Sequence, residues 1–290
     1  MIQLLKLFIR AGLWMFCSDI TIKHKELLQQ KGQLLIIANH PNSFLDAIII
    51  GAQYKRRVYF LARGDAFNKK HHRFILGLLN MIPVYRQKEG KQYLHLNEFA
   101  FEKSIHLLKK GEAVLIFIEG ICINSHQLQP FKKGTTRILE GAQKHGIYPN
   151  IHRVGISYNQ LRGIGKKINI CINNIKINQS ILIPKDRVEL NKKVFELLKQ
   201  QIIIPTQETT IKKTPLYYLH LPYYKWIEKK VTKSTRGTVF FDSVLFSVLL
   251  FTYPVFLILI FYFLYIIGLA LPIIFGTLLC ILLLSKQTIK

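Results

Sequence analysis

Short apolar runs alternate with segments of helical pattern along most of the chain. Leu34–Ala38 and Ala113–Ile118 have the length of buried strands, and in the segment between Phe44 and Tyr54 apolar residues recur at helical spacing. We further predict strands at Val58–Ala62, Pro83–Tyr85, Ile151–Tyr158 and Ile168–Ile177, and helices at Asp65–Leu79, Gln92–Lys110, Thr135–His145 and Asp186–Ile203. This alternation predicts an α/β domain over residues 21–204, with a mostly parallel sheet flanked by helices.

The carboxyl-terminal part has a different pattern. From Ser243 to Ser285 no side chain is charged, and the stretches 244–264 and 266–284 each have about the 20 residues that a transmembrane helix needs. We therefore predict a transmembrane hairpin over residues 239–290 that turns near Ile266–Gly268, joined to the domain by a basic segment over 205–238. The alternative is a long hairpin buried in a soluble core.

The amino-terminal residues 1–20 carry a second membrane signal, which is an amphipathic helical pattern. Gln3, Lys6 and Arg10 fall at helical spacing among large apolar residues, which is typical of a helix that lies in the membrane interface. The charges within the apolar run exclude a cleaved signal peptide. An ordinary helix packed on the domain fits the same pattern, and both interpretations stay open.

The distribution of charge predicts how the protein is oriented in the membrane. The chain has 41 Lys+Arg against 16 Asp+Glu, a formal net charge of +25, and 50% hydrophobic residues, which excludes a wholly disordered chain. Basic residues flank the predicted hairpin on both sides, at Lys225, Lys229, Lys230, Lys233, Arg236, Lys286 and Lys290. The positive-inside rule then predicts an integral membrane protein with its large domain on the cytoplasmic face, in contact with membrane lipids.

Two classes of function find no support in the sequence. The basic residues are scattered and form no known nucleic-acid-binding module, so we predict no nucleic-acid partner. The 4 cysteines are far apart, which predicts free thiols and neither a disulfide framework nor a zinc site. We also expect no metal and no cofactor.

The first candidate for chemistry follows the strand Leu34–Ala38. His40 precedes a predicted helix, and Asp46 lies one turn into it. A carboxylate that holds one imidazole nitrogen leaves the other free to take a proton from a hydroxyl. The competing interpretation is a capping-box-like arrangement, in which Ser43 is the N-cap of the helix and Asp46 follows three residues later.

The second and third candidates place charged residues at other strand ends. Glu119 and Gly120 end an apolar strand, and Gly120 permits close approach of a ligand to the backbone. Lys132, Lys133 and Arg137 surround a predicted helix start, which favours an anion site, although a solvated basic loop fits equally well. Arg86 follows a short strand, where a guanidinium can bind phosphate bidentately, although a lone surface arginine fits the same position.

Together, in this order, these segments resemble the glycerol-phosphate acyltransferase family, which is similar to lysophosphatidate acyltransferases. The resemblance covers about residues 30–160 and has four blocks. They are Asn39–Asp46, Ile82–Arg86, Phe117–Gly120 and, weakly, Val154–Tyr158. It implies the same mostly parallel α/β fold.

The sequence departs from the family pattern at three places, and these departures affect which residue roles the resemblance implies. Five residues instead of four separate His40 from Asp46, a spacing closer to the glycerol-3-phosphate acyltransferase branch. Ile118 replaces the proline that the family usually has, and Ile121–Ile123 replace its usual Thr-Arg-Ser. The family arginine that would contact phosphate is therefore absent, which shifts phosphate binding towards Lys132, Lys133 and Arg137. The fourth block has Arg153 in place of its proline, so no role is carried over from it.

The resemblance implies a membrane-bound O-acyltransferase of phospholipid biosynthesis. His40 is then the general base supported by Asp46, and the acyl donor is acyl-CoA or acyl carrier protein. The acceptor is glycerol 3-phosphate or lysophosphatidate, bound by Arg86, Glu119 and Gly120, with added positive charge from Lys132, Lys133 and Arg137. Arg63 contacts the donor or a phosphate, although a solvated basic face fits this residue equally well. The alternatives are a lipid-binding scaffold without catalytic activity and an acyltransferase that acts on another lysolipid.

Overall fold

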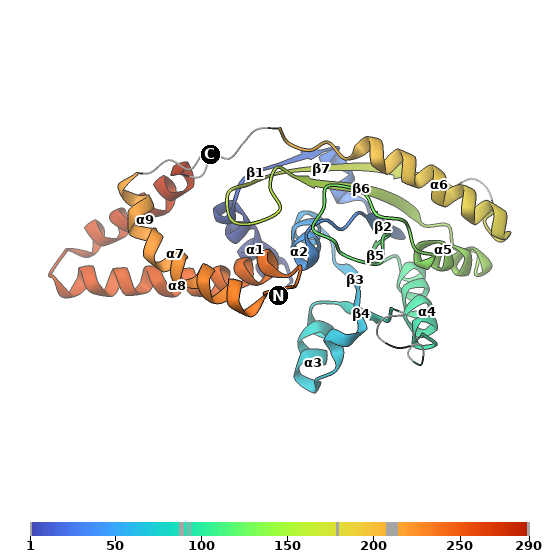
Figure 1. Ribbon diagram of the computed structural model, residues 1–290, viewed down its shortest axis with the longest axis horizontal. Coiled ribbons are helices and arrows are strands. Elements are labelled where there is room, and N and C mark those ends of the chain that lie inside the picture. Colours follow the sequence, from blue (N-terminus) through green and yellow to red (C-terminus); the bar gives the residue numbers. More distant parts are fainter. Residues whose placement is uncertain are drawn as a thin grey trace.

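The computed structural model describes residues 2–86, 90, 92, 94–177, 180–206 and 214–288. Within them a seven-stranded sheet has the order β1-β7-β6-β2-β5-β3-β4 (Figure 1). The strands are β1 (Cys17–Lys23), β2 (Leu34–Ala38), β3 (Val58–Arg63), β4 (Met81–Val84), β5 (Ala113–Phe117), β6 (Asn150–Tyr158) and β7 (Lys166–Ile175). Neighbouring strands are parallel except β6 and β7, which are antiparallel. The predicted mostly parallel α/β fold is confirmed.

Helices cover both faces of this sheet. They are α1 (Ile2–Phe16), α2 (Ser43–Gln53), α3 (Lys70–Leu78), α4 (Leu96–Lys109), α5 (Gly134–Lys144), α6 (Pro184–Gln201), α7 (Pro215–Ser234), α8 (Phe241–Ile266) and α9 (Leu271–Thr288), with short 3-10 turns η1 (Lys25–Gln29) and η2 (Gly64–Phe67). Side chains of β2 alternate between two cores: Leu34 and Ile36 pack with α1, α2 and α8, whereas Leu35 and Ile37 pack with α4, α5 and α6. Because helices cover both faces of the sheet, the central strands are continuous apolar runs in the sequence.

The structure differs from the sequence prediction at the amino terminus. α1 ends at Phe16, and the following residues form β1, which pairs with β7 at the sheet edge. The segment CSDITIK alternates outward polar and inward apolar side chains, as an edge strand does, but the preceding helical pattern concealed it.

The polar stripe of α1 faces the protein. The Lys6 ammonium donates hydrogen bonds to the carbonyls of Tyr54 and Arg56, each at 2.6 Å, and Arg10 Nε donates to the carbonyl of Ala52 at 2.7 Å. These cations thereby satisfy carbonyls at the carboxyl end of α2, where the helix dipole is negative. Leu4 and Leu7 on the other side of α1 are 72% and 64% exposed. α1 is thus packed on the domain by its polar stripe and presents an apolar face outwards.

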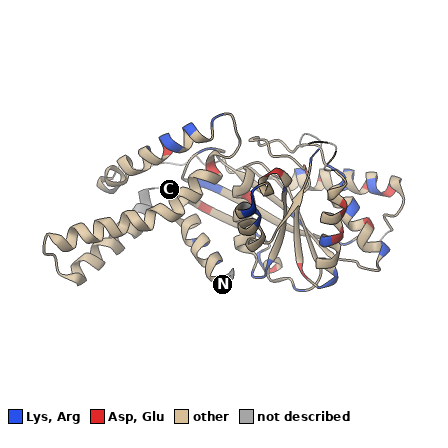
Figure 2. Cartoon of the chain, turned by 90° about the horizontal axis from the view of Figure 1, so that it is seen from below, with Lys and Arg blue, Asp and Glu red and all other residues tan. Residues whose placement is uncertain are grey.

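The carboxyl-terminal helices extend away from the sheet as an arm without charged side chains along most of its length (Figures 1 and 2). In the part of the chain that the structure describes, α8 is the one helix long and apolar enough to cross a membrane; its apolar 18-residue stretch has mean hydropathy 2.6 and is 11% buried. The turn to α9 follows Ile266, near the predicted place. Within the described side chains, Leu271–Leu282 of α9 forms a shorter apolar helix. The second span, predicted over 266–284, stays a prediction. The predicted basic flank Lys290 lies outside the described residues.

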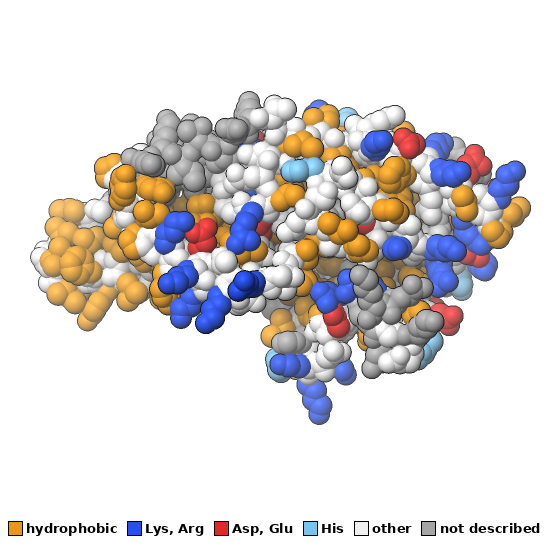
Figure 3. Space-filling model, in the orientation of Figure 1, with side chains coloured by type: hydrophobic (Ala, Val, Ile, Leu, Met, Phe, Trp, Pro, Cys, Tyr) orange, Lys and Arg blue, Asp and Glu red, His pale blue; other side chains and the backbone are white. Residues whose placement is uncertain are grey.

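The predicted connecting segment contains the long helix α7. Its sequence shows weak periodicity and contains Pro222 in the helix interior, which is why the sequence did not predict it. Lys225, Lys229, Lys230 and Lys233 lie exposed on α7. In Figure 3 basic side chains gather beside the apolar end of the molecule.

Candidate active site

The candidate site lies where two neighbouring parallel strands end. Ala38 at the end of β2 pairs with Phe117 at the end of β5, so the loops that carry His40 and Glu119 leave the same sheet edge. Asn39 fixes the first loop to β6: its Nδ2 donates to the carbonyl of Ile156 at 2.9 Å, and the N–H of Ile156 donates to its Oδ1 at 2.8 Å.

His40 and Asp46 are in contact. His40 Nδ1 lies 2.9 Å from Asp46 Oδ2, and the same oxygen accepts the backbone N–H of Asn42 at 2.7 Å. The sequence left a His–Asp pair and a helix cap as alternatives. In the structure the N-cap of α2 is Asn42 and not Ser43. Asp46 Oδ2 accepts the N–H of this N-cap residue and also contacts the imidazole, so one carboxylate oxygen makes both contacts.

The His40 ring is fixed but reachable. It stacks on Phe117 with ring centroids 3.7 Å apart and an interplanar angle of 9°. Its side chain is 16% exposed, whereas that of Asp46 is fully buried at 0%. Nδ1 faces the carboxylate, and among the described residues Nε2 has no hydrogen-bond partner, so Nε2 is the nitrogen that a substrate hydroxyl can approach.

Glu119 holds the His40 loop through its backbone. Its carboxylate accepts the N–H of His40 at 2.8 Å and the N–H of Gln129 at 3.3 Å. Burial raises the pKa of Glu119 to about 7, and the two backbone hydrogen bonds partly offset that rise. The sequence predicted that Glu119 binds the acceptor. It did not predict the hydrogen bond between the Glu119 carboxylate and the backbone of His40.

Gly120 and Lys132 lie against each other. Gly120 has φ 64°, a conformation that favours glycine, and a Cβ there would meet Lys132 Cγ at 2.7 Å. The backbone N–H of Lys132 donates to the carbonyl of Ile118 at 2.9 Å. The structure thus brings this lysine to the end of β5, beside the proposed site.

The other predicted cations separate into two groups. Arg63 forms an ion pair with Asp65, and Arg86 is close enough to lower the pKa of Asp65 together with Arg63, so these residues gather at the ends of β3 and β4. Lys133 is the residue before α5, and the Arg137 guanidinium lies 5.9 Å from the ring centroid of Phe101 on α4. Arg137 is therefore directed towards α4.

Cys122 stands where the family pattern has an arginine. Its Sγ accepts the backbone N–H of Ser43 at 2.9 Å, and burial raises the pKa of its thiol to about 12. A thiol with such a pKa stays protonated near neutral pH and is a poor nucleophile.

Two parts of the site were missed in the sequence. The Tyr158 hydroxyl donates a hydrogen bond to Asp46 Oδ1 from the end of β6. From the first turn of α8, Asp242 Oδ2 accepts Asn42 Nδ2 at 2.9 Å. The available signals were a tyrosine in the weak fourth block and one acidic residue at the very start of a long apolar helix.

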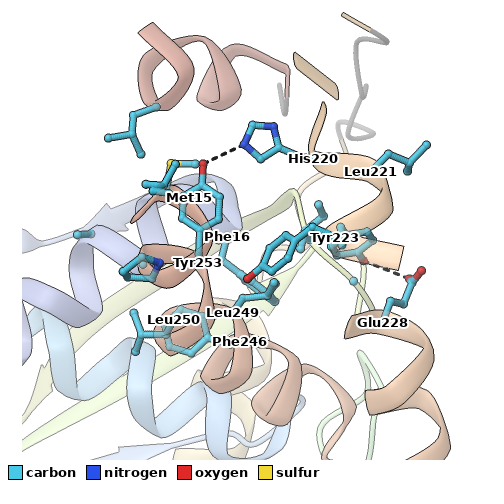
Figure 4. A pocket seen from close by; sticks show the side chains of 18 of the residues that line it. Met15, Phe16, His220, Leu221, Tyr223, Glu228, Phe246, Leu249, Leu250 and Tyr253 are labelled. Atoms are coloured by element: carbon cyan, nitrogen blue, oxygen red, sulfur yellow. Dashed lines mark hydrogen bonds between the residues drawn. The ribbon is translucent and has the colours of Figure 1, made fainter. Parts of the chain in front are cut away.

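A cavity of about 540 Å³ lies between α1, α7 and α8, separate from His40. Figure 4 shows its wall of apolar side chains, among them Phe16, Leu249 and Leu250. At one end His220 Nε2 and the Tyr253 hydroxyl share a hydrogen bond of 3.0 Å. The cavity is suited to an apolar ligand with one polar end.

Part of this chain is similar to known acyltransferases. The crystal structure of the 1-acyl-sn-glycerophosphate (LPA) acyltransferase PlsC from Thermotoga maritima is similar at 19% identity and a TM-score of 0.47, covering 67% of this chain and 75% of that chain. No curated protein matches the chain in sequence. The family model of the acyltransferases matches residues 19–153. The segment that carries His40, Asp46 and Glu119 lies within the residues that match this model.

Proposed function

We propose that the protein is a membrane-bound O-acyltransferase of phospholipid biosynthesis. It transfers a fatty acyl group from a thioester, acyl-CoA or acyl carrier protein, to the hydroxyl of glycerol 3-phosphate or lysophosphatidate. The observation that carries the proposal is the 2.9 Å contact between His40 Nδ1 and Asp46 Oδ2 within the acyltransferase-family segment.

The mechanism needs one general base. His40 Nε2 takes the proton of the acceptor hydroxyl as its oxygen attacks the thioester carbonyl carbon, and Asp46 stabilises the imidazolium through Nδ1. The C–S bond then breaks, and the leaving thiolate takes the proton from His40. A positioned general base contributes roughly 10²–10⁴-fold to the rate. The high thiol pKa of Cys122 supports direct transfer without an acyl-cysteine.

The acceptor's phosphate requires cations near this base. Lys132 lies beside Gly120, and we assign it together with Lys133 and Arg137 to the phosphate or its surroundings. Arg86 and Arg63, at the ends of β4 and β3, are assigned to the acceptor phosphate and to the acyl donor. Ion pairing with Asp65 keeps a guanidinium oriented at this edge.

The membrane part brings the site to its lipid substrate. α8 has the length and hydropathy of a membrane span, and exposed apolar side chains such as Phe251 (65%) and Ile258 (63%) need a nonaqueous environment. The exposed lysines of α7 suit anionic headgroups on the cytoplasmic side. We therefore propose an integral protein with its α/β domain in the cytoplasm.

The test is an acyl-transfer assay on purified protein in lipid. Labelled acyl-CoA and acyl carrier protein thioesters are offered with glycerol 3-phosphate, lysophosphatidate and lysolipids with other headgroups. We expect activity with a phosphorylated acceptor and a loss of at least 100-fold in His40→Gln. The matched control His106→Gln changes an exposed histidine of α4 and keeps full activity. A fully active His40→Gln variant would refute the proposal.

The cavity favours a second candidate, a lipid-binding scaffold without catalysis. It offers about 540 Å³ of mostly apolar space that His40 does not line. A scaffold would bind lysolipid in the same preparation yet transfer no acyl group from either donor. Binding without turnover across the whole panel selects this candidate over the enzyme.

A further inference from the structure

The apolar helix α8 begins inside the α/β domain. Its first residues Asp242 and Ser243 are 2% and 4% exposed. Ser243 Oγ accepts the backbone N–H of Leu45 in the first turn of α2, at 3.0 Å. The helix with the length of a membrane span is therefore hydrogen-bonded directly to the helix that carries Asp46.

Asp242 gathers three donors around one buried carboxylate. Oδ2 accepts Asn42 Nδ2 at 2.9 Å and pairs with the Lys166 ammonium at 2.8 Å, and Oδ1 accepts the N–H of Gly163 at 2.8 Å. Lys166 is fully buried; burial lowers its pKa, and Asp242 acts against that decrease. A buried ion pair costs desolvation unless its remaining atoms are hydrogen-bonded, and here neighbouring loops supply those bonds.

Asn42 connects this ion pair with the proposed catalytic pair. Its side chain donates to Asp242, and its backbone N–H donates to the Asp46 oxygen that contacts His40. In the described structure Asn42 Oδ1 is buried without a partner, because Nδ2 serves both Asp242 and the carbonyl of Leu161. The hydrogen bond to Asp242 thus sets the orientation of the Asn42 amide, and the amide oxygen is left without a donor.

We propose that Asp242 is a positioning residue for acyl transfer, which holds the Asn42 loop so that Asp46 meets His40. The inference rests on the proposed function and adds α8 to the support of the site. α2 is then held at both ends by helices with exposed apolar faces, by α8 at its amino end and by α1 at its carboxyl end. Such a frame aligns the base with the lipid surface.

The test separates positioning from plain stability. The double variant Asp242→Leu/Lys166→Met removes both buried charges, and such replacements are often neutral for stability. We expect a modest fall in melting temperature, because Asn42 Nδ2 and the N–H of Gly163 lose their acceptor. We expect an unchanged KM for the thioester and a kcat that falls roughly 10- to 100-fold because the base is misplaced. Asp242→Asn/Lys166→Met keeps one acceptor oxygen and restores part of kcat. The control Glu140→Leu/Lys144→Met removes an ion pair on α5 and leaves kcat unchanged.

Amide exchange provides a readout that needs no turnover. Exchange over residues 40–46 rises in Asp242→Leu/Lys166→Met and stays at the wild-type level in the α5 control. An unchanged kcat overturns the inference, and so does a loss of kcat that falls and recovers only in parallel with the melting temperature. If wild-type protein transfers no acyl group, the proposed function fails; unchanged exchange over residues 40–46 would then refute the Asp242 contact as well.

Discussion

The Tyr158 hydroxyl and His40 hold opposite oxygens of the Asp46 carboxylate. Tyr158 donates to Oδ1, and His40 Nδ1 lies 2.9 Å from Oδ2. Burial and the neighbouring carboxylate raise the pKa of Tyr158 well above its usual value, so the hydroxyl keeps its proton and remains a donor. Because both oxygens are held, the carboxylate plane is directed at the imidazole.

The variant Tyr158→Phe removes one of these two contacts. We expect the free energy of unfolding to fall by about 1–3 kcal/mol, since a buried carboxylate oxygen loses its donor. We also expect kcat to fall about tenfold with little change in KM, because Asp46 is free to turn away from His40. Denaturant titration and initial rates measure the two effects on the same preparation.

Tyr54→Phe is the matched control. The Tyr54 hydroxyl shares a 3.0 Å hydrogen bond with His152 Nδ1, also in the core but away from His40 and Asp46. This variant should lose a similar amount of stability and keep its kcat. Equal kcat values in Tyr158→Phe and Tyr54→Phe would contradict the role of Tyr158.

Cys122→Ser tests for a covalent intermediate. Burial raises the pKa of the Cys122 thiol to about 12, and serine can also accept the N–H of Ser43 in place of sulfur. We expect kcat to stay within about twofold of wild type, because in the proposed reaction the acyl group passes directly to the acceptor. Intact-mass measurement of wild-type protein with donor alone should show no acyl adduct. An adduct on Cys122 would replace direct transfer by a two-step reaction.

The sequence predicted the local features of the site and missed the distant ones. The runs Leu34–Ala38 and Ala113–Phe117 were visible because strands covered on both faces are continuously apolar. His40 and Asp46 are six residues apart and therefore belong to one loop and helix start. Tyr158 reaches Asp46 across a separation of 112 residues, and Asp242 reaches Asn42 across 200.

These distant contacts depend on strand order and helix packing. β6 lies beside β2 only because of the sheet order, and no short pattern encodes that neighbourhood. α7 was also missed because its apolar positions follow no clear period, although Thr214 caps it by accepting the N–H of Tyr217. Propensity and periodicity describe single elements, whereas these features arise from packing between elements.

Glu119 makes stability depend on pH in a defined direction. Its pKa is raised from 4.5 to about 7 in the folded protein, chiefly by burial. Between these values the folded state keeps a proton that the unfolded state releases, so stability falls as the pH rises towards about 7 and is level above it. The shift corresponds to a change of about 3 kcal/mol at most.

Glu119→Gln removes this titration. Urea unfolding of wild type and variant at pH 5 and pH 8 should show the stability advantage of wild type shrinking at the higher pH. Glu140→Gln is the control, because hydrogen bonding to Lys144 lowers the pKa of Glu140 and its contribution is lost only as the pH falls. Parallel pH curves for wild type and Glu119→Gln would rule out a raised pKa at this position.

The outward apolar face of α1 predicts contact with lipid. The chain has 2 tryptophans, and Trp14 on α1 is 44% exposed, so the variant Trp226→Phe reports on α1 alone. In proteoliposomes with brominated lipid we expect strong quenching of Trp14 fluorescence, because Lys6 and Arg10 hold the polar stripe of α1 against α2 and leave its apolar face outside.

Two further variants separate insertion from packing. Leu4→Ser with Leu7→Ser changes side chains that are 72% and 64% exposed, so it should reduce lipid quenching and leave the free energy of unfolding unchanged. Lys6→Met removes two hydrogen bonds to carbonyls after α2 and should lower the free energy of unfolding by about 1–3 kcal/mol. If acrylamide in water quenches Trp14 and brominated lipid does not, α1 faces solvent, and the exposed leucines then need another partner than the bilayer.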